Sequence, residues 1–232
     1  MEYASLCLNK GFKVHARLNV SSKSAKLPKG IKRVPKPTRS TDIALELTNI
    51  SIKEKKKNLI ELDRIVRPKV PILSSCVTVT AAEQSGWITR PARLIGLGAL
   101  PSLLEGTLIE LATSDATDKP SIAAAKEFTK AVGKNCALVR DSVGLVLPRI
   151  VCMLANEACF ALMEGVAAKR DIDTAMKLGT NYPFGPIEWA ERIGLRQVFA
   201  VMAALHQEFG EDRYRVAPLL RQGALQNVFP GG

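Results

Sequence analysis

The stretch LIGLGALPSLLEGTLIEL, residues 94–111, has the pattern of an active-site rim, because two β-like runs flank a glycine-rich turn. Its only ionisable side chains are Glu105 and Glu110. A carboxylate that is removed from water can have a raised pKa and can then act as a general base. A carboxylate beside an Arg or Lys forms an ion pair instead. Both interpretations are open for Glu110.

The elements that must position this rim alternate between strand-like and helix-like patterns. Residues 51–69 predict a helix, because Leu59, Leu62 and Ile65 recur at helical spacing and Pro68 ends the pattern. Further strands are expected at 11–18, 42–49, 70–76, 93–98, 107–111 and 135–141, and further helices at 81–87 and 119–134. This alternation predicts an open α/β sheet with helices on its faces.

The pattern changes after Asp141, where no strand signal is left. Helices are expected at 145–166, at 171–179 with Asp171 as the N-cap, at 186–193 and at 194–209. We therefore expect an α/β domain at residues 1–141 and an all-α domain at 142–232. The apolar faces of the first and last of these helices must be buried, and we expect them to form a homodimer interface.

The composition is that of an ordinary globular chain, with 47% apolar and 24% charged residues among 232. No stretch resembles a transmembrane helix or a signal peptide, so we expect a cytoplasmic protein without a membrane partner. Its five cysteines show no C-x-x-C spacing and it has only two histidines. These features predict free thiols and no metal site.

Positive charge is concentrated in the first part of the chain. Residues 1–70 hold 17 Lys or Arg and 6 Asp or Glu, whereas the remaining residues are balanced at 16 of each. The peak is the basic segment, residues 21–40, with seven basic residues, three prolines and no acid. It can be a solvated surface loop, a contact for the phosphates of a nucleotide or CoA, or a nucleic-acid contact. The last is least supported, because the segment has no aromatic residues to stack on bases.

Two stretches carry a resemblance to a known family. DSVGLVLPRIV and NEACFALMEGVAAKRDIDTAMKLGTNYPFGPIEWAERIGL resemble the C-terminal domain of the 3-hydroxyacyl-CoA dehydrogenases. DIALEL, LIELDRIVRPKVPIL and RPARLIGL fit the nucleotide-binding domain of the same family at consistent spacing. The resemblance implies a Rossmann-like domain that binds NAD, followed by a helical domain that dimerises and closes over an acyl-CoA.

The resemblance also assigns roles to the rim. In the family a histidine removes the proton of the 3-hydroxyl group while hydride leaves for nicotinamide, and a glutamate twelve residues later orients that histidine. The glutamate matches Glu110, and the position of the histidine is Gly98. The stretch is therefore interpreted as the catalytic rim of the family without its imidazole. His15 as a relocated base is a weaker alternative.

Other positions depart from the family pattern as well. The serine that binds the substrate hydroxyl falls on Val77, which leaves Ser75 and Thr78 as the candidate substrate-binding hydroxyls. The asparagine of the long helix falls on Pro148. Of the two charged residues near the nicotinamide ribose, only the lysine is kept, as Lys55, the candidate cofactor-binding residue.

The sequence lacks part of the NAD-binding site of the family. A Rossmann pyrophosphate site needs a strand, a G-x-G-x-x-G turn and a helix N-terminus, and no such pattern is found. The acidic residue that holds the ribose would fall near Leu18 or Asn19. Because the first strand of the family sheet is central, its neighbours must pair with each other, with another chain or with the basic segment.

Three functions follow from these observations. The first is a member of the family with impaired catalysis that keeps the fold and an acyl-CoA pocket. The second is an active NAD-dependent 3-hydroxyacyl-CoA oxidoreductase that uses Glu110 in a modified site. The third, and least supported, is a nucleic-acid binder that acts through the basic N-terminal region.

Overall fold

A five-stranded sheet organises the first half of the chain, as the computed structural model shows for the described residues 1–18 and 26–229. Its strands are adjacent in chain order: β3 (Ala44–Glu46), β4 (Ile72–Ser75), β5 (Leu94–Leu97), β6 (Leu108–Ala112) and β7 (Asn135–Val139). All neighbours are parallel except β5 and β6, which are antiparallel. The predicted α/β sheet is confirmed, although β3, β4, β5 and β7 are shorter than the pattern suggested and β6 begins one residue later.

Helices cover both faces of this sheet. On one face, α2 (Ile52–Ile65) buries Leu59 against Ile72 and Leu94. On the other face, α1 (Glu2–Asn9) and α4 (Lys119–Ala131) share a core with the alternate residues Leu73 and Ile95. The short helix α3 (Ala81–Ser85) and the 3-10 helices η2 (Pro91–Arg93) and η3 (Leu103–Glu105) lie in the connections. The alternation along each strand thus places α2 and α4 on opposite sides of the sheet.

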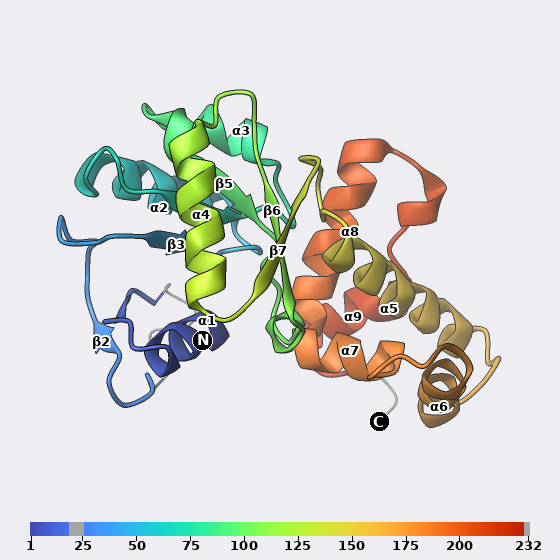
Figure 1. The fold of residues 1–232 in the computed structure, drawn as a ribbon. Coiled ribbons are helices and arrows are strands. Elements are labelled where there is room, and N and C mark those ends of the chain that lie inside the picture. The colour runs from blue at the N-terminus through green and yellow to red at the C-terminus, as the bar shows by residue number, and fades with distance from the viewer. Residues whose placement is uncertain (19–25, 230–232) are drawn as a thin grey trace.

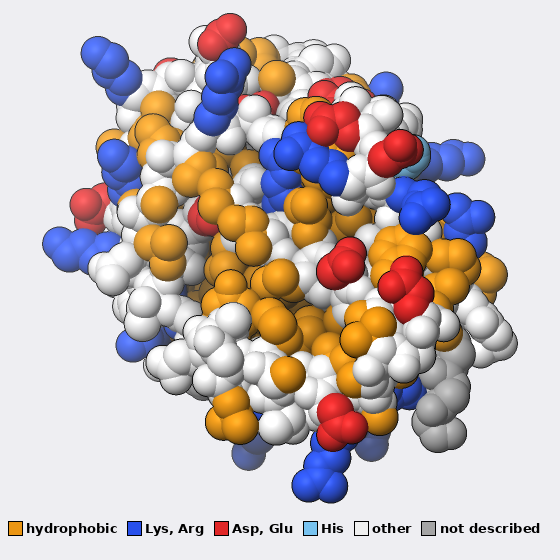
Figure 2. All heavy atoms as spheres, turned by 90° about the vertical axis from the view of Figure 1, so that its right-hand side faces the viewer, with side chains coloured by type: hydrophobic (Ala, Val, Ile, Leu, Met, Phe, Trp, Pro, Cys, Tyr) orange, Lys and Arg blue, Asp and Glu red, His pale blue; other side chains and the backbone are white. Residues whose placement is uncertain are grey.

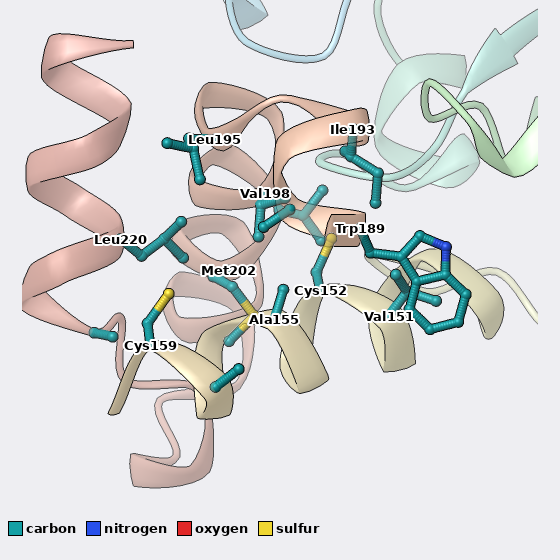
Figure 3. Packing of buried hydrophobic residues seen from close by; sticks show 14 of the residues in the cluster. Val151, Cys152, Ala155, Cys159, Trp189, Ile193, Leu195, Val198, Met202 and Leu220 are labelled. Carbon is teal, nitrogen blue, oxygen red and sulfur yellow. The ribbon is translucent and has the colours of Figure 1, made fainter. Parts of the chain in front are cut away.

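The second half of the chain is helical and lies to one side of the sheet (Figure 1). It consists of α5 (Leu147–Met163), α6 (Lys169–Thr180), α7 (Pro186–Ile193), α8 (Leu195–Phe209), the 3-10 helix η4 (Asp212–Tyr214) and α9 (Pro218–Gln226). Its core is formed where α5 crosses α7, α8 and α9, and Figure 3 shows Cys152 and Ala155 of α5 facing Val198 and Met202 of α8. Within the described chain, no helix combines the length and apolar character that a membrane crossing needs.

Two details of the helical half differ from the expectations. Helix α6 begins at Lys169 with Ala168 as its N-cap, so Asp171 lies in the first turn instead of capping the helix. Its charge still faces the positive end of the helix dipole. Helix α9 was not predicted. Much of the apolar surface of α5 and α8 is buried against α7 and α9 within the chain, while Leu147, Ile150 and Met163 of α5 stay exposed.

The first strands do not join the main sheet. The expected strand at 11–18 is reduced to β1 (His15–Ala16), which pairs in parallel with β2 (Lys32–Arg33) of the basic segment. In the described part of the chain, β3 is therefore the edge of the five-stranded sheet and has a strand partner only in β4. The basic segment thus contributes a strand, but to a separate two-stranded sheet. Its residues 21–25 lie outside the described residues.

Candidate functional site

The turn between β5 and β6 brings Gly98 and Glu110 together. The backbone N–H of Gly98 donates to the carbonyl oxygen of Glu110 at 2.9 Å. A Cβ atom built on Gly98 would lie 3.2 Å from the Cβ of Glu110 and 3.5 Å from its Oε2. The same atom would lie 3.4 Å from Cδ1 of Leu145. The volume around Gly98 is thus occupied by the glutamate and a leucine, and a larger side chain there requires these neighbours to move.

The carboxylate of Glu110 is buried and is bound to backbone amides at the start of α5. Its Oε2 accepts the N–H of Val146 at 3.0 Å, and its Oε1 accepts the N–H of Leu147 at 2.8 Å. The first amides of a helix lack intrahelical partners and carry partial positive charge, so a carboxylate is stabilised there. The expected partner of a non-catalytic Glu110 was an Arg or Lys side chain. That expectation is wrong, because the partner is the N-terminus of a helix.

A small cavity lies beside this pair. It is lined by Tyr3, Gly98, Leu103, Leu104, Leu108, Ile109, Glu110, Leu147 and Pro148. It has room for about one water molecule. Its lining is apolar except for Glu110 and the hydroxyl of Tyr3, and Pro148 adds no amide group where the family has an asparagine. A water molecule fits beside the carboxylate, whereas an imidazole or an acyl chain is larger than this space.

The two candidate substrate-binding hydroxyls are bonded to the protein backbone. Ser75 Oγ donates to the carbonyl oxygen of Ala99 at 3.3 Å, and Thr78 Oγ1 donates to that of Asn49 at 2.9 Å. Both side chains are buried and neither lines the cavity. Val77, at the position of the family serine, belongs to the hydrophobic core. In this arrangement neither hydroxyl is presented to the space beside Glu110.

Lys55 is fully buried in an ion pair. Its Nζ donates to Oε2 of Glu46 at 2.5 Å and to Oγ of Ser74 at 3.2 Å. Asn58 donates to the other carboxylate oxygen of Glu46 at 3.1 Å. The role of Glu46 was missed from the sequence; the signal was an acid on the same face of a strand as Ala44, which is buried. The lysine therefore stabilises the junction of β3, β4 and α2, and its charge is already compensated.

The strand-to-helix connections of the described residues lack the glycines of a Rossmann pyrophosphate site. Three strand-to-helix connections lead into α2, α3 and α4 in the described residues, at 47–51, 76–80 and 113–118, and none contains glycine. A Cβ on each residue keeps a pyrophosphate away from the backbone amides. Leu18 is not acidic, and Asn19 lies outside the described residues.

Side chains from both halves of the chain bind the rim. Arg192 of α7 donates to Oε1 of Glu105 at 2.6 Å, and its guanidinium lies 4.0 Å from the ring centroid of Phe184. Lys134 donates to the carbonyl oxygens of Leu104 and Gly106 at 2.8 and 2.7 Å. The rim is thus fixed from both sides. His15, the alternative base, lies in β1 and does not line the cavity.

Comparison with known proteins identifies the family of this chain. Residues 144–230 match the family model of the 3-hydroxyacyl-CoA dehydrogenase C-terminal domain. The chain is 33% identical over 179 residues to the 3-hydroxybutyryl-CoA dehydrogenase of Bradyrhizobium diazoefficiens, which covers 77% of this chain and 61% of the relative. The crystal structure of (S)-3-hydroxybutyryl-CoA dehydrogenase from Ralstonia eutropha is 32% identical with a TM-score of 0.70, over 84% of this chain and 70% of that one. The chain belongs to the 3-hydroxyacyl-CoA dehydrogenase family.

The extent of the similarity differs between sequence and structure. The chain spans 61–63% of the length of two curated 3-hydroxybutyryl-CoA dehydrogenases that it matches, from Bradyrhizobium diazoefficiens and Bacillus subtilis. FadB2 of M. tuberculosis has a TM-score of 0.80 over 97% of this chain at 20% identity, which shows the shared fold. The fold shared with the Ralstonia eutropha enzyme, over 84% of this chain, and with FadB2 therefore extends over both halves of the chain.

Proposed function

We propose that this chain is a non-catalytic member of the 3-hydroxyacyl-CoA dehydrogenase family that binds acyl-CoA without oxidising it. The observation that carries the proposal is the pair formed by Gly98 and Glu110. Oxidation of a 3-hydroxyl group needs a base for the hydroxyl proton as hydride leaves the carbon, and the position of that base has no side chain. The glutamate that remains is engaged by two amides of α5. Loss of a general base costs on the order of 10²–10⁴ in rate.

The competing function is an active oxidoreductase in which Glu110 itself takes the proton. Burial among apolar residues favours this role in principle. However, each carboxylate oxygen already accepts one amide hydrogen, and the protonated form would lose at least one of these bonds. The hydrogen bonds at the start of α5 therefore favour a structural role for this carboxylate.

The two functions are separated by one assay. The purified protein is mixed with NAD and a 3-hydroxyacyl-CoA such as 3-hydroxybutyryl-CoA, and NADH formation is followed by absorbance. We expect no turnover above background, while calorimetry with the acyl-CoA alone shows binding. Turnover that is lost in Glu110→Gln would contradict the proposal and assign the base to Glu110. Absence of acyl-CoA binding would also contradict the proposal.

NAD is the cofactor that the family implies, and we expect this chain to bind it weakly if at all. The support is the absence of glycine from the three connections described above and the compensated charge of Lys55. Titration of the protein with NAD, followed by quenching of the intrinsic fluorescence, measures the affinity directly. Binding in the micromolar range that is typical of cofactor-dependent enzymes would contradict this expectation.

We also propose that the chain divides into domains at residues 1–141 and 142–232 and forms a homodimer through the helical half. Figure 2 views the molecule from the side of the helical half and shows apolar side chains gathered across the middle of this face. Exposed apolar residues of this half include Met163, Val166, Leu178 and Leu225. Light scattering after gel filtration gives the mass in solution, and a monomer at micromolar concentration would contradict the dimer.

A further inference from the structure

The positive charge of the first 70 residues is not neutralised by their own acids. Ion pairs hold four of the six acidic side chains: Glu46 with Lys55, Asp63 with Arg93, Asp42 with Arg67 and Glu61 with Arg17. Glu2 accepts the N–H of Ser102. Only the half-buried Glu54 has no partner of this kind among the described residues. The exposed lysines of this region are therefore in large excess over the available acids.

The outer side of α2 concentrates this excess. Ile52, Lys53, Lys56, Lys57, Ile60 and Arg64 are all exposed. Their spacing of i, i+1, i+4, i+5, i+8 and i+12 places them along one side of the helix. We call these six residues the cationic face. In the described residues no member of the face has an acidic partner, and two of the six are large aliphatic side chains.

Two arginines beside this face are already paired with acids. Arg17, which follows β1, is paired with Glu61 of α2, and Arg67 donates to Asp42 at 2.7 Å and to the carbonyl oxygen of Thr41 at 3.3 Å. These contacts join Arg17 to α2, and join Thr41 and Asp42 to Arg67, which lies just after α2. Figure 1 shows α2 and β2 on the side of the sheet domain that points away from the helical half. A binding partner can thus reach this side without touching the rim at Glu110.

We propose that the cationic face docks on an anionic lipid surface. Lysines close to a bilayer are attracted by acidic headgroups, and aliphatic side chains between them enter the boundary of headgroups and acyl chains. The indole of Trp87, which is half-buried beside the face with Lys56 at 5.6 Å from its ring centroid, adds a residue type favoured at that boundary. No membrane partner was expected from the sequence because no stretch resembles a transmembrane helix, but a peripheral contact needs no spanning helix.

A nucleic acid is the competing polyanion. Its binding surfaces combine basic residues with several aromatic side chains on which successive bases stack, whereas the cationic face carries isoleucines and has one aromatic neighbour, the half-buried Trp87. Ile52 and Ile60 are 37% and 46% exposed, and they gain nothing from a phosphate backbone. The isoleucines therefore favour a lipid surface and provide the means to distinguish the two partners.

The test is co-sedimentation of the full chain with phosphatidylcholine vesicles, with and without phosphatidylserine, at low and high salt. We expect binding only to vesicles with phosphatidylserine, and its loss at high salt. The triple variant Lys53→Gln, Lys56→Gln, Lys57→Gln is expected to lower the partition coefficient about 100-fold, from the typical contribution of each lysine. The matched control changes Lys119, Lys126 and Lys130 of α4, which are exposed on the opposite face of the sheet. It removes the same charge and is expected to bind as the unmodified protein.

A second variant identifies the partner. Ile52→Ser with Ile60→Ser keeps every charge, and we expect it to weaken vesicle binding while leaving any association with a single-stranded oligonucleotide unchanged. Circular dichroism and thermal melting verify that each variant is folded. The proposal is overturned if the protein ignores phosphatidylserine, if both lysine triples bind equally, or if the oligonucleotide binds more tightly than the vesicles.

Discussion

The Oε1 atom of Glu110 lies 2.8 Å from the backbone nitrogen of Leu147. This contact crosses from a strand of the sheet to the first turn of α5, 37 residues later in the chain. The carboxylate at the position of the family's orienting glutamate thus stabilises a helix N-terminus. A charged acceptor satisfies two amides that the helix itself leaves without partners.

The first prediction concerns this junction. We expect Glu110→Gln to lower the free energy of unfolding by about 1–3 kcal/mol, because a neutral amide oxygen replaces a charged acceptor and its NH₂ group faces an N–H donor. Urea denaturation followed by circular dichroism measures the change. Glu127→Gln on the exposed side of α4 is the control, and we expect it to leave stability unchanged. Equal stability of both variants would show that the helix start does not depend on Glu110.

The second prediction concerns the space at Gly98. We expect Gly98→Ala to destabilise the protein by about 1–3 kcal/mol, because the new Cβ meets Glu110 and Leu145 at 3.2 and 3.4 Å. Gly179→Ala is the matched control. No atom lies within 4 Å of a Cβ at Gly179, which is inside α6, so alanine is expected to stabilise that helix by up to about 1 kcal/mol. Thermal melting measures both changes: we expect a lower melting temperature for Gly98→Ala and an unchanged or higher one for Gly179→Ala.

A related expectation applies to Gly98→His. The imidazole must displace Leu145 or the carboxylate from α5 before it can act as a base, so we expect this variant to be less stable and to form no NADH from 3-hydroxybutyryl-CoA. Restored turnover would show that the rim keeps every other part of a working site. It would also show that the contact between Glu110 and the start of α5 can be broken with little loss of stability.

The third prediction follows from the network around Asp63. Burial by itself would raise the pKa of this carboxyl, but hydrogen bonds from Thr89 and Arg93, with the charge of Arg90, hold the pKa below its ordinary value of 3.8. A carboxyl with a lowered folded-state pKa contributes stability above its unfolded-state value and loses it as pH falls through the folded-state value. The free-energy difference between the unmodified protein and Asp63→Asn should therefore be constant at neutral pH and shrink below about pH 4. Asp115→Asn, at an exposed position, should show no such trend.

Much of the fold could be predicted from local signals. Helix α7 has the predicted bounds, because Pro186 stands at its first turn and Gly194 follows its last residue. Helix α9 was missed because PLLRQGALQ has a glycine in its interior and only a short apolar pattern. It forms because Leu220 and Ala224 are buried in the core with α8, and that stabilisation is tertiary.

The candidate site, like the fold, was predicted only in part. The proximity of Gly98 and Glu110 followed from a resemblance that fixes two positions on neighbouring strands. The amide partners of Glu110 did not follow, because they depend on how α5 approaches the sheet. The ion pair of Glu46 with Lys55 was missed for a similar reason, since it needs the start of α2 to lie over β3. Local sequence therefore predicts elements better than the contacts between them.

The last prediction concerns the thiols. All five cysteines are free, and burial raises the pKa of Cys7 to about 11 and those of Cys76 and Cys159 to about 12. Burial also raises the pKa of Cys152. Because the thiolate is the nucleophile, these four should resist Ellman's reagent near pH 8 until the protein unfolds. Cys136 of β7 is only half-buried and should react first.

The measurement compares the native protein with the protein in guanidinium chloride. We expect a single fast thiol in the native state and five thiols after unfolding. Cys136→Ala should abolish the fast phase and leave the remaining four slow. A fast phase that survives this substitution would mean that one of the four buried positions opens to solvent in the native ensemble. Cys7 of α1 and Cys159 of α5 report on different halves of the chain, so the surviving thiol would identify the half that opens.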